Sequence, residues 1–536
     1  MAQEEYRVIT NKGIDVAEID YDLQRDTSSD AGVDSNVFPD RTCDVSHAKA
    51  TNNRITCYML EPAEAEKLKA DGRILDVEPS SIDNNRELFA VQNDGFQRTA
   101  VDQQTDKNWG LYRHIFKEWQ ADQAADQTFT GDYNYTLDGT GVDIVIQDDG
   151  VDPTGHPEWN DYNGTTRFQQ IDWYAASGVS GTLPSGYYTN NYSDSNAAGA
   201  HGSHCCGIAA GATYGWAKNA QLYSVRLFGG TSAMSMNDIY DVIREWHLKK
   251  PIDPNTGFRR PTIVNQSWGY SNTYSNNGQL TSIYFKGVNQ NITPANFSSA
   301  FVNYGMTGSK HPIQSSSADV EQQQLTDAGI ICVKAAGNAY HPCAYLTTGQ
   351  YGSGIYDSYY TATSYGSSRF YYNRPSSPHS EDTLFVANMD QGQYGSEEKL
   401  RPSSERGPRI DISAGGSSIS SATSQVSLYG SKQLYPGSST HYMAKISGTS
   451  MAAPQICGMG ALWLQANPGG TAAQFKNFLT QNSTETLYDS GTAESFSYGN
   501  SYPRLYGAPN RTAHWPYNSP NPLKFRGTSG NDQTDL

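Results

Sequence analysis

Residues 446–454 read ISGTSMAAP, and an apolar segment of helical length, residues 455–466, follows them directly. Gly448 permits a tight turn, and the small residues after Ser450, together with Pro454, suit the first turn of a helix. This pattern predicts a serine at a helix N-terminus, where backbone N–H groups can stabilise a developing negative charge. A serine before a helix is more commonly an N-cap, so the segment alone leaves both interpretations open.

Upstream of this segment, short apolar runs alternate with helix-like stretches. Four apolar runs predict strands, at residues 142–147, 221–227, 261–264 and 330–335. Helix-like stretches lie between them, at residues 202–210, 235–247 and 320–328. Buried strands that alternate with helices are typical of a mostly parallel sheet covered on both faces. We therefore expect an α/β, doubly wound fold.

A histidine opens the first of these helices, in the segment AHGSHCCG at residues 200–207. A serine hydroxyl needs a neighbouring imidazole to take its proton, so His201 is a candidate general base. His204, one turn later, is an alternative, and a buried structural histidine is the other interpretation of either residue. A metal site is not favoured, because no carboxylate accompanies the two histidines in this segment.

Two further polar residues follow predicted strands. Asp148 ends the strand at 142–147, and a carboxylate at the C-terminal end of a parallel strand lies where such sheets place their sites. It could accept the second imidazole N–H. Asp149 and Asp152 are rivals, although both are expected to be solvated turn residues. Asn338 follows the strand at 330–335 and could face an oxyanion, but asparagine after glycine is also a common turn residue.

In the order Asp, His, Asn, Ser, these residues resemble the subtilisin-like serine proteases. The segment GTSMAAP resembles the nucleophile motif of that family, HGSHCCG its histidine motif, and DDGV followed by HPE its aspartate motif. The histidine motif favours His201 over His204. The resemblance covers about residues 108–482. It implies a subtilisin-like fold and a serine endopeptidase with Asp148, His201 and Ser450 as its triad and Asn338 in its oxyanion hole.

The resemblance also implies a substrate cleft. Ser267, Trp268 and Gly269 match the segment whose backbone pairs with substrate and forms one wall of the specificity pocket, and the opposite wall would be Ala335, Ala336 and Gly337. The Ser-Trp-Gly segment is closer to the kexin branch than to the bacterial enzymes. Kexins carry acidic residues after it, whereas here residues 270–272 read YSN. A preference for arginine or lysine is therefore not expected.

The N-terminal residues predict a separate unit. A strand at 55–60, a helix at 61–71 and a strand at 73–77 suggest a small α+β module over residues 1–85, which resembles the family's inhibitory propeptide, cut off in cis. Residues 86–107 are expected to be a linker that holds the maturation site. A catalytic domain over 108–484 and an extended tail over 485–536 would complete the chain. The expected partners are a protein or peptide substrate and the protein's own N-terminal module.

Composition excludes other classes. The formal net charge of −17 argues against nucleic-acid binding. No stretch approaches the ~18–20 apolar residues of a membrane span. Residues 1–6 lack the features of a secretory signal, which favours an intracellular or particle-associated location. The seven cysteines show no CxxC spacing and are expected to be mostly reduced, with Cys43–Cys57 and Cys332–Cys343 as the candidate disulfides.

No cofactor is expected. In bacterial subtilisins a longer loop contributes to a calcium site where this chain has the short connection 211–216, so that site is expected to be missing, while calcium elsewhere is left open. An alternative function is a structural or binding protein on the same scaffold, within a larger particle. Long insertions rich in Tyr, Asn, Ser and Gly motivate it, at residues 162–200, 270–309, 340–380 and 417–441.

Overall fold

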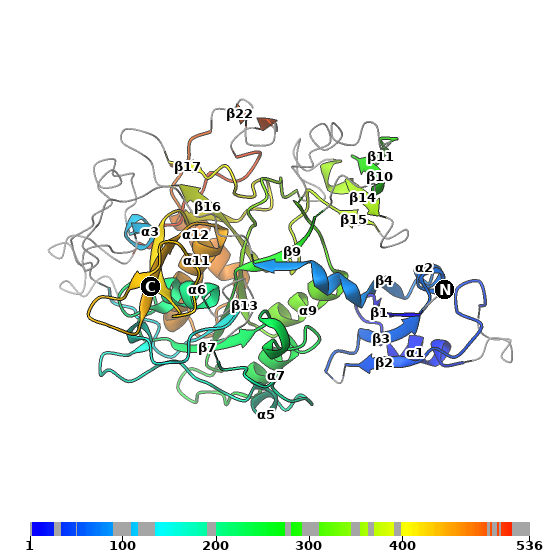
Figure 1. Ribbon diagram of the computed structural model, residues 1–536, viewed down its shortest axis with the longest axis horizontal. Helices are drawn as coiled ribbons and strands as arrows, with labels where there is room; N and C mark the ends of the chain where they lie inside the picture. Colours follow the sequence, from blue (N-terminus) through cyan, green and yellow to red (C-terminus); the bar gives the residue numbers. More distant parts are fainter. Residues whose placement is uncertain are drawn as a thin grey trace.

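The computed structural model covers the whole chain (Figure 1). The residues that it describes are 3–25, 34–49, 51–88, 109–115, 135–189, 200–273, 280–291, 310–344, 354–362, 369–390, 398–489, 494–495, 501–502 and 505–516.

A seven-stranded sheet forms the centre of the molecule, in the strand order β17-β16-β13-β8-β6-β7 with β18 paired to β16. Its strands are β6 (Asp143–Asp148), β7 (Gln221–Arg226), β8 (Thr262–Gln266), β13 (Ile331–Ala335), β16 (Leu384–Asp390), β17 (Lys399–Leu400) and β18 (Ile412–Gly415). All pairs are parallel except the one between β16 and β17. The predicted α/β fold with a mostly parallel sheet is confirmed.

Helices cover both faces of this sheet, as Figure 1 shows. One face carries α3 (Trp109–Arg113), α6 (His201–Ala210), α11 (Thr449–Ala466) and α12 (Ala472–Asn482), and the other carries α5 (Trp173–Ser177), α7 (Asp241–Lys249) and α9 (Ser316–Asp327). Side chains of β6 alternate between the two layers: Ile144 and Ile146 belong to the core under α6 and α11, and Val145 to the core under α5 and α7. This alternation follows from the two-residue period of a strand.

The N-terminal module has its own antiparallel sheet, in the order β2-β3-β1-β4. Its elements are β1 (Glu4–Thr10), α1 (Ala17–Leu23), β2 (Val45–Ala48), β3 (Ile55–Leu60), α2 (Pro62–Leu68) and β4 (Ile74–Pro79). A separate apolar core that includes Val8, Leu60 and Leu68 holds it together. In Figure 1 the module is the blue part at the right, beside α9.

The expected linker begins with ordered chain. After the 3-10 turn η1 (Ser80–Asn85), β5 (Arg86–Leu88) pairs antiparallel with β9 (Trp268–Thr273), which pairs on its other side with β12 (Lys310–Pro312). Residues 86–88 are therefore a strand, which the polar composition of this segment concealed. Residues 89–108 lie outside the described residues, and so does most of the expected linker.

Two of the long insertions share a small sheet that was not predicted. Strands β10 (Leu280–Phe285) and β11 (Val288–Asn289) come from one insertion, and β14 (Tyr359–Ala362) and β15 (Phe370–Tyr371) from the other. Figure 1 shows this sheet apart from the central one. The insertion at 417–441 supplies β19 (Ile419–Thr423) and β20 (Gln433–Leu434), which pair with β21 (Tyr442–Ile446). Tyrosines that cover one another, such as the stacked pair Tyr284 and Tyr359, explain how such polar segments form strands.

The described part of the expected tail packs on the domain of the central sheet instead of extending from it. Ala513 and Trp515 are buried in the main core, and the Ala513 N–H donates to the Ser413 carbonyl at 3.0 Å. Before them, β22 (Glu494–Ser495) pairs with β23 (Ser501–Tyr502). The remaining 3-10 turns are η2 (Pro157–Trp159), η3 (Gly230–Ser232) and η4 (Ile355–Asp357).

Two expectations from composition can be compared with the structure. All seven cysteines are free and buried, so neither Cys43–Cys57 nor Cys332–Cys343 is a disulfide. In the part of the chain that the structure describes, no helix combines the length and apolar character needed to cross a bilayer.

Candidate active site

The carboxyl end of β6 meets the N-terminus of α6. Asp148, the last residue of β6, accepts a hydrogen bond from Nδ1 of His201, the first residue of α6, at 2.7 Å. Both side chains are buried. Gly202 makes the close approach possible, because a Cβ there would lie 2.3 Å from the Gly150 carbonyl oxygen. The sequence predicted this pair from two segments 53 residues apart.

The contact changes the protonation of the imidazole. Burial opposes a charge on His201, but the Asp148 carboxylate and then the Cys205 sulfur outweigh it, and the pKa of His201 is raised well above its usual value. The Asp148 carboxylate also fixes the tautomer in which Nε2 carries no proton in the neutral ring. In the part of the chain that the structure describes, this buried Nε2 atom has no hydrogen-bond partner.

Asp149 and Asp152 are not the solvated turn residues that were expected. Asp149 is buried and accepts hydrogen bonds from the backbone N–H groups of His201 (3.3 Å) and Gly202 (2.7 Å), so it caps α6. Burial and the neighbouring Asp148 carboxylate raise the pKa of Asp149 to about 7. Asp152 is also buried, and its carboxylate accepts from Thr154 within its own turn. Both aspartates shape the loop after β6.

His204, the alternative base, does not contact a carboxylate. Its Nε2 lies 3.0 Å from the Ala444 carbonyl oxygen of β21. Burial lowers the pKa of His204 to about 3, so the ring is neutral and its Nε2–H donates to that carbonyl. His204 joins α6 to β21, while His201 faces Asp148.

The serine segment starts its helix earlier than predicted. α11 begins at Thr449, so Ser450 is its second residue and Pro454 lies inside it, not in its first turn. Because Pro454 has no N–H, the Ser450 carbonyl lacks its usual helical donor. It accepts instead from Ser267 Oγ at 3.0 Å and from Cys205 Sγ at 3.3 Å. The proline therefore leaves the Ser450 carbonyl open to Ser267, which lies between β8 and β9, and to Cys205 of α6.

The model of the subtilase family matches residues 139–501, which is more than half of the chain. The chain belongs to the subtilase family. A cuticle-degrading serine protease of Arthrobotrys oligospora is 24% identical over 431 residues, 80% of this chain and 73% of that relative. Alkaline serine exoprotease A of Vibrio alginolyticus is 25% identical over 256 residues, 46% of this chain and 39% of that relative.

A solved structure adds a further likeness. The crystal structure of fervidolysin from Fervidobacterium pennivorans, a keratinolytic enzyme related to subtilisin, has a TM-score of 0.49 and 17% identity, and the match covers 94% of this chain and 60% of fervidolysin. As a subtilase, the chain is a serine endopeptidase, and its substrates are peptide bonds.

In this subtilase the Ser450 hydroxyl does not donate its hydrogen bond to the His201 imidazole. Ser450 Oγ donates to the Ser267 carbonyl oxygen at 3.1 Å. Cys205 links the two halves of the site, since its Sγ lies 4.0 Å from His201 Nδ1 and also donates to the Ser450 carbonyl. Of the side chains that the structure describes, Asp148, His201 and Cys205 form the one group of potential metal ligands, with atoms within 4.8 Å of one another.

Asn338 lies against the turn that precedes Ser450. Its Oδ1 accepts hydrogen bonds from the Thr449 N–H and the Thr449 hydroxyl, both at 3.0 Å. These bonds fix which way the amide points, and its Nδ2 would lie 3.2 Å from a Cβ at Gly448. Thr449 Oγ1 also accepts from the Gly337 N–H at 3.1 Å. Thr449, the residue before Ser450, is thus hydrogen-bonded to both Gly337 and the Asn338 amide.

The two expected walls of the specificity pocket lie on neighbouring elements. Ser267 precedes β9, which begins at Trp268, and the Trp268 side chain is buried in the core. Ala335 ends β13, and Ala336 and Gly337 continue toward Asn338. Gly337 has a φ of +122°, and a Cβ there would lie 2.6 Å from Glu405 Cγ. Glycine is therefore required at that wall.

Sequence reasoning missed four contributors to this site. Thr449 and Pro454 were visible in the motif, but their roles depend on contacts with distant segments. Cys205 was considered only as a thiol, and Glu405 had no motif of its own. Burial raises the pKa of Glu405 to about 8. Its backbone N–H donates to the Gly337 carbonyl at 2.9 Å, which supports the wall from behind.

Proposed function

We propose that this subtilase hydrolyses peptide bonds with Ser450 as nucleophile, His201 as general base, Asp148 as the group that orients His201, and Asn338 as an oxyanion donor. The observation that carries the proposal is the buried 2.7 Å contact between Asp148 and His201, with Nε2 left without a hydrogen-bond partner among the described residues. Cys205 of the same helix donates to the Ser450 carbonyl. A buried imidazole nitrogen without a partner is costly unless a reacting group uses it.

The reaction needs one rotation. The Ser450 hydroxyl turns from the Ser267 carbonyl to His201 Nε2, which takes its proton as Oγ attacks the substrate carbonyl carbon. Asn338 Nδ2 and the Ser450 N–H stabilise the oxyanion that forms. His201 then protonates the leaving amine, and water hydrolyses the acyl-enzyme by the reverse sequence of proton transfers. Active-site hydrogen bonds are often incomplete without substrate, which agrees with this rotation.

Labelling with a fluorophosphonate probe tests the assignment, because the probe reacts only with an activated serine. The native chain should be labelled at Ser450, and Ser450→Ala should not be labelled. Ser450→Ala should also lower kcat by about 10⁶-fold, the loss that removing the serine causes in subtilisin. A native chain that folds but neither reacts with the probe nor cleaves casein would favour the alternative, a binding protein on this scaffold.

We also infer that the enzyme cuts its own N-terminal segment at the Phe89–Ala90 bond. Strand β5 lies on β9 as a substrate would, with Glu87 opposite Gly269 and Leu88 opposite Trp268. A substrate strand that continued this register by one residue would bring its next position opposite Ser267, whose carbonyl accepts from Ser450 Oγ. A substrate in this register presents the bond after position 89 to the nucleophile. Phenylalanine there agrees with the lack of acidic residues after Ser267-Trp268-Gly269.

Mass spectrometry of the mature N-terminus tests this register. The mature chain should begin at Ala90, and Ser450→Ala should stay uncut. Phe89→Asp should slow processing by at least roughly tenfold, because burying a carboxylate in an apolar pocket is unfavourable, whereas Phe89→Tyr should process normally. A native chain that starts at any other residue would show that the register does not set the cut.

A further inference from the structure

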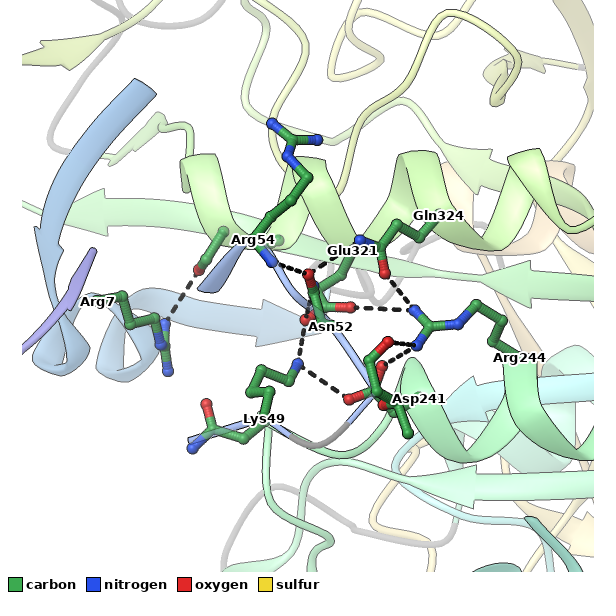
Figure 2. A network of polar contacts seen from close by, with 12 residues as sticks. Arg7, Lys49, Asn52, Arg54, Asp241, Arg244, Glu321 and Gln324 are labelled. Atoms are coloured by element: carbon green, nitrogen blue, oxygen red, sulfur yellow. Dashed lines mark hydrogen bonds and ion pairs between the residues drawn. The ribbon is translucent and has the colours of Figure 1, made fainter. Parts of the chain in front are cut away.

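The N-terminal module and the catalytic domain share a buried cluster of charges (Figure 2). Lys49, next to β2 of the module, extends its ammonium group between the carboxylates of Asp241 on α7 and Glu321 on α9. The Lys49–Asp241 distance is 3.3 Å, and Lys49 also donates a hydrogen bond to Glu321. All three side chains are at most 4% exposed.

Arg244 of α7 completes the cluster from the catalytic side. Its guanidinium lies 2.8 Å from Asp241 and 3.8 Å from Glu321, and it donates to the Thr51 carbonyl of the module at 2.8 Å. Two side-chain amides link the module to α9, as Figure 2 shows. Asn52 donates to Glu321 at 2.8 Å, and Gln324 donates to Asn52 at 2.9 Å.

The buried charges in this cluster balance only when the module is bound. The catalytic domain contributes the buried carboxylates of Asp241 and Glu321 and the buried Arg244 guanidinium, which also contacts the more exposed Glu245 at 3.1 Å. Lys49 supplies the second buried positive charge. Burial opposes that charge, but Glu321 and then Asp241 outweigh it and raise the pKa of Lys49, so the ammonium form is the one bound. A complete buried ion pair adds little net stability, but removing one of its partners strongly destabilises the complex, because the other charge stays buried without a partner. Such a cluster discriminates between partners more than it adds affinity.

We propose that Asp241 and Glu321 form an ammonium-binding site on the catalytic domain, and that Lys49 is the residue by which this domain recognises its own N-terminal module. The partner that this surface fits is a β-sheet module that presents one lysine between Asp241 of α7 and Glu321 of α9. The proposal extends the self-processing proposed above, because it concerns the two fragments that cleavage leaves together.

The other contacts of this interface do not provide the same selection. Glu78 accepts from the Ser316 and Ser317 N–H groups at the start of α9, at 2.9 and 3.3 Å, and from the hydroxyls of Ser315 (2.9 Å) and Ser317. Ser316 Oγ also donates to Asp76 at 2.5 Å. All of these donors are neutral groups, whereas Lys49 places a charge between two carboxylates. Lys12 and Asp327 are paired at 3.8 Å but are 80% and 49% exposed. An exposed pair of this kind contributes little. Lys12 therefore serves as a matched control for Lys49.

The experiment separates recognition from catalysis. The Ser450→Ala chain receives a recognition site for an unrelated, sequence-specific protease within residues 92–106, and cleavage there gives the noncovalent fragment pair whether or not the enzyme processes itself. The Kd of the two fragments is then measured. Lys49→Met should raise it on the order of 10²- to 10³-fold, because Asp241 and Glu321 are left buried with too little positive charge. Lys12→Met should change it less than about threefold.

A double-mutant cycle between Lys49 and Glu321 gives the deciding result. In a catalytic fragment with Glu321→Gln, the loss caused by Lys49→Met should shrink to less than about tenfold, because fewer acids are left without a cation. Losses that simply add, or a Lys49→Met effect no larger than that of Lys12→Met, would overturn the proposal. If Lys49→Met fails to fold by circular dichroism, Glu321→Gln with native Lys49 tests the site from the other side and should itself weaken binding at least tenfold. Failed self-cleavage in the native chain would contradict the proposed function and leave this result intact.

Discussion

The active centre and the Lys49 cluster both bury opposite charges, but they differ in what their side chains contact. In the Lys49 cluster every charged group faces an opposite charge, and amides join the two domains around them. Asp241 Oδ1 and Glu321 Oε2 make no hydrogen bond to the described residues, yet each faces the Arg244 guanidinium. In the active centre the Asp148–His201 pair is equally buried, but His201 Nε2 faces no partner among the described residues and the Ser450 hydroxyl donates to Ser267. Paired charges suit a surface that holds a partner, and an imidazole nitrogen without a protein partner suits a site that moves a proton.

Asp148→Asn breaks the paired half of the active centre and should have the largest effect in this comparison. kcat should fall by about 10⁴-fold, as for the equivalent change in a Ser-His-Asp triad, because an amide does not hold the reactive tautomer. The native kcat/KM should fall as pH drops below the raised pKa of His201, since the base must be unprotonated. Without the carboxylate this limb should move to lower pH. A pH–rate profile that stays in place would contradict the assigned partner.

Asn338→Ala removes the amide without touching the Asp148–His201 pair. We expect kcat to fall by about 10²- to 10³-fold with little change in KM, because the amide contributes when negative charge develops on the substrate oxygen. Steady-state kinetics on a short peptide measures both constants. A loss confined to KM would mean that Asn338 binds substrate in its ground state instead.

Thr449→Val should have the smallest effect on kcat of the three active-centre substitutions. It removes the hydroxyl that contacts Asn338 Oδ1 and the Gly337 N–H, and the loss of one or two hydrogen bonds should lower kcat by roughly tenfold. In an Asn338→Ala background the same change should cost less than about threefold, because Thr449 acts by positioning the amide. Equal losses in both backgrounds would assign Thr449 a role independent of Asn338.

Much of the central sheet could be predicted from the local sequence. The strands β6, β7, β8 and β13 were predicted within about two residues, because buried parallel strands are continuous apolar runs with clear ends. The small sheet of β10, β11, β14 and β15 was missed, because its polar, tyrosine-rich strands come from two insertions and neither is apolar alone. The start of α11 was placed too late, because a proline inside a helix is normally read as a first-turn residue.

The sequence by itself determined the types and order of the proposed reactive groups: Asp148, His201, Asn338 and Ser450 stand in motifs whose residue types are set by local turns and helix starts. Only the tertiary structure decided which atoms those groups contact. Asp149 became a buried cap and not a solvated turn, the Ser450 hydroxyl turned to Ser267, and Lys49 met Asp241 and Glu321 across 192 and 272 residues of chain. Contacts between segments far apart in the sequence depend on how the helix and sheet layers pack, and a local sequence pattern does not specify that packing.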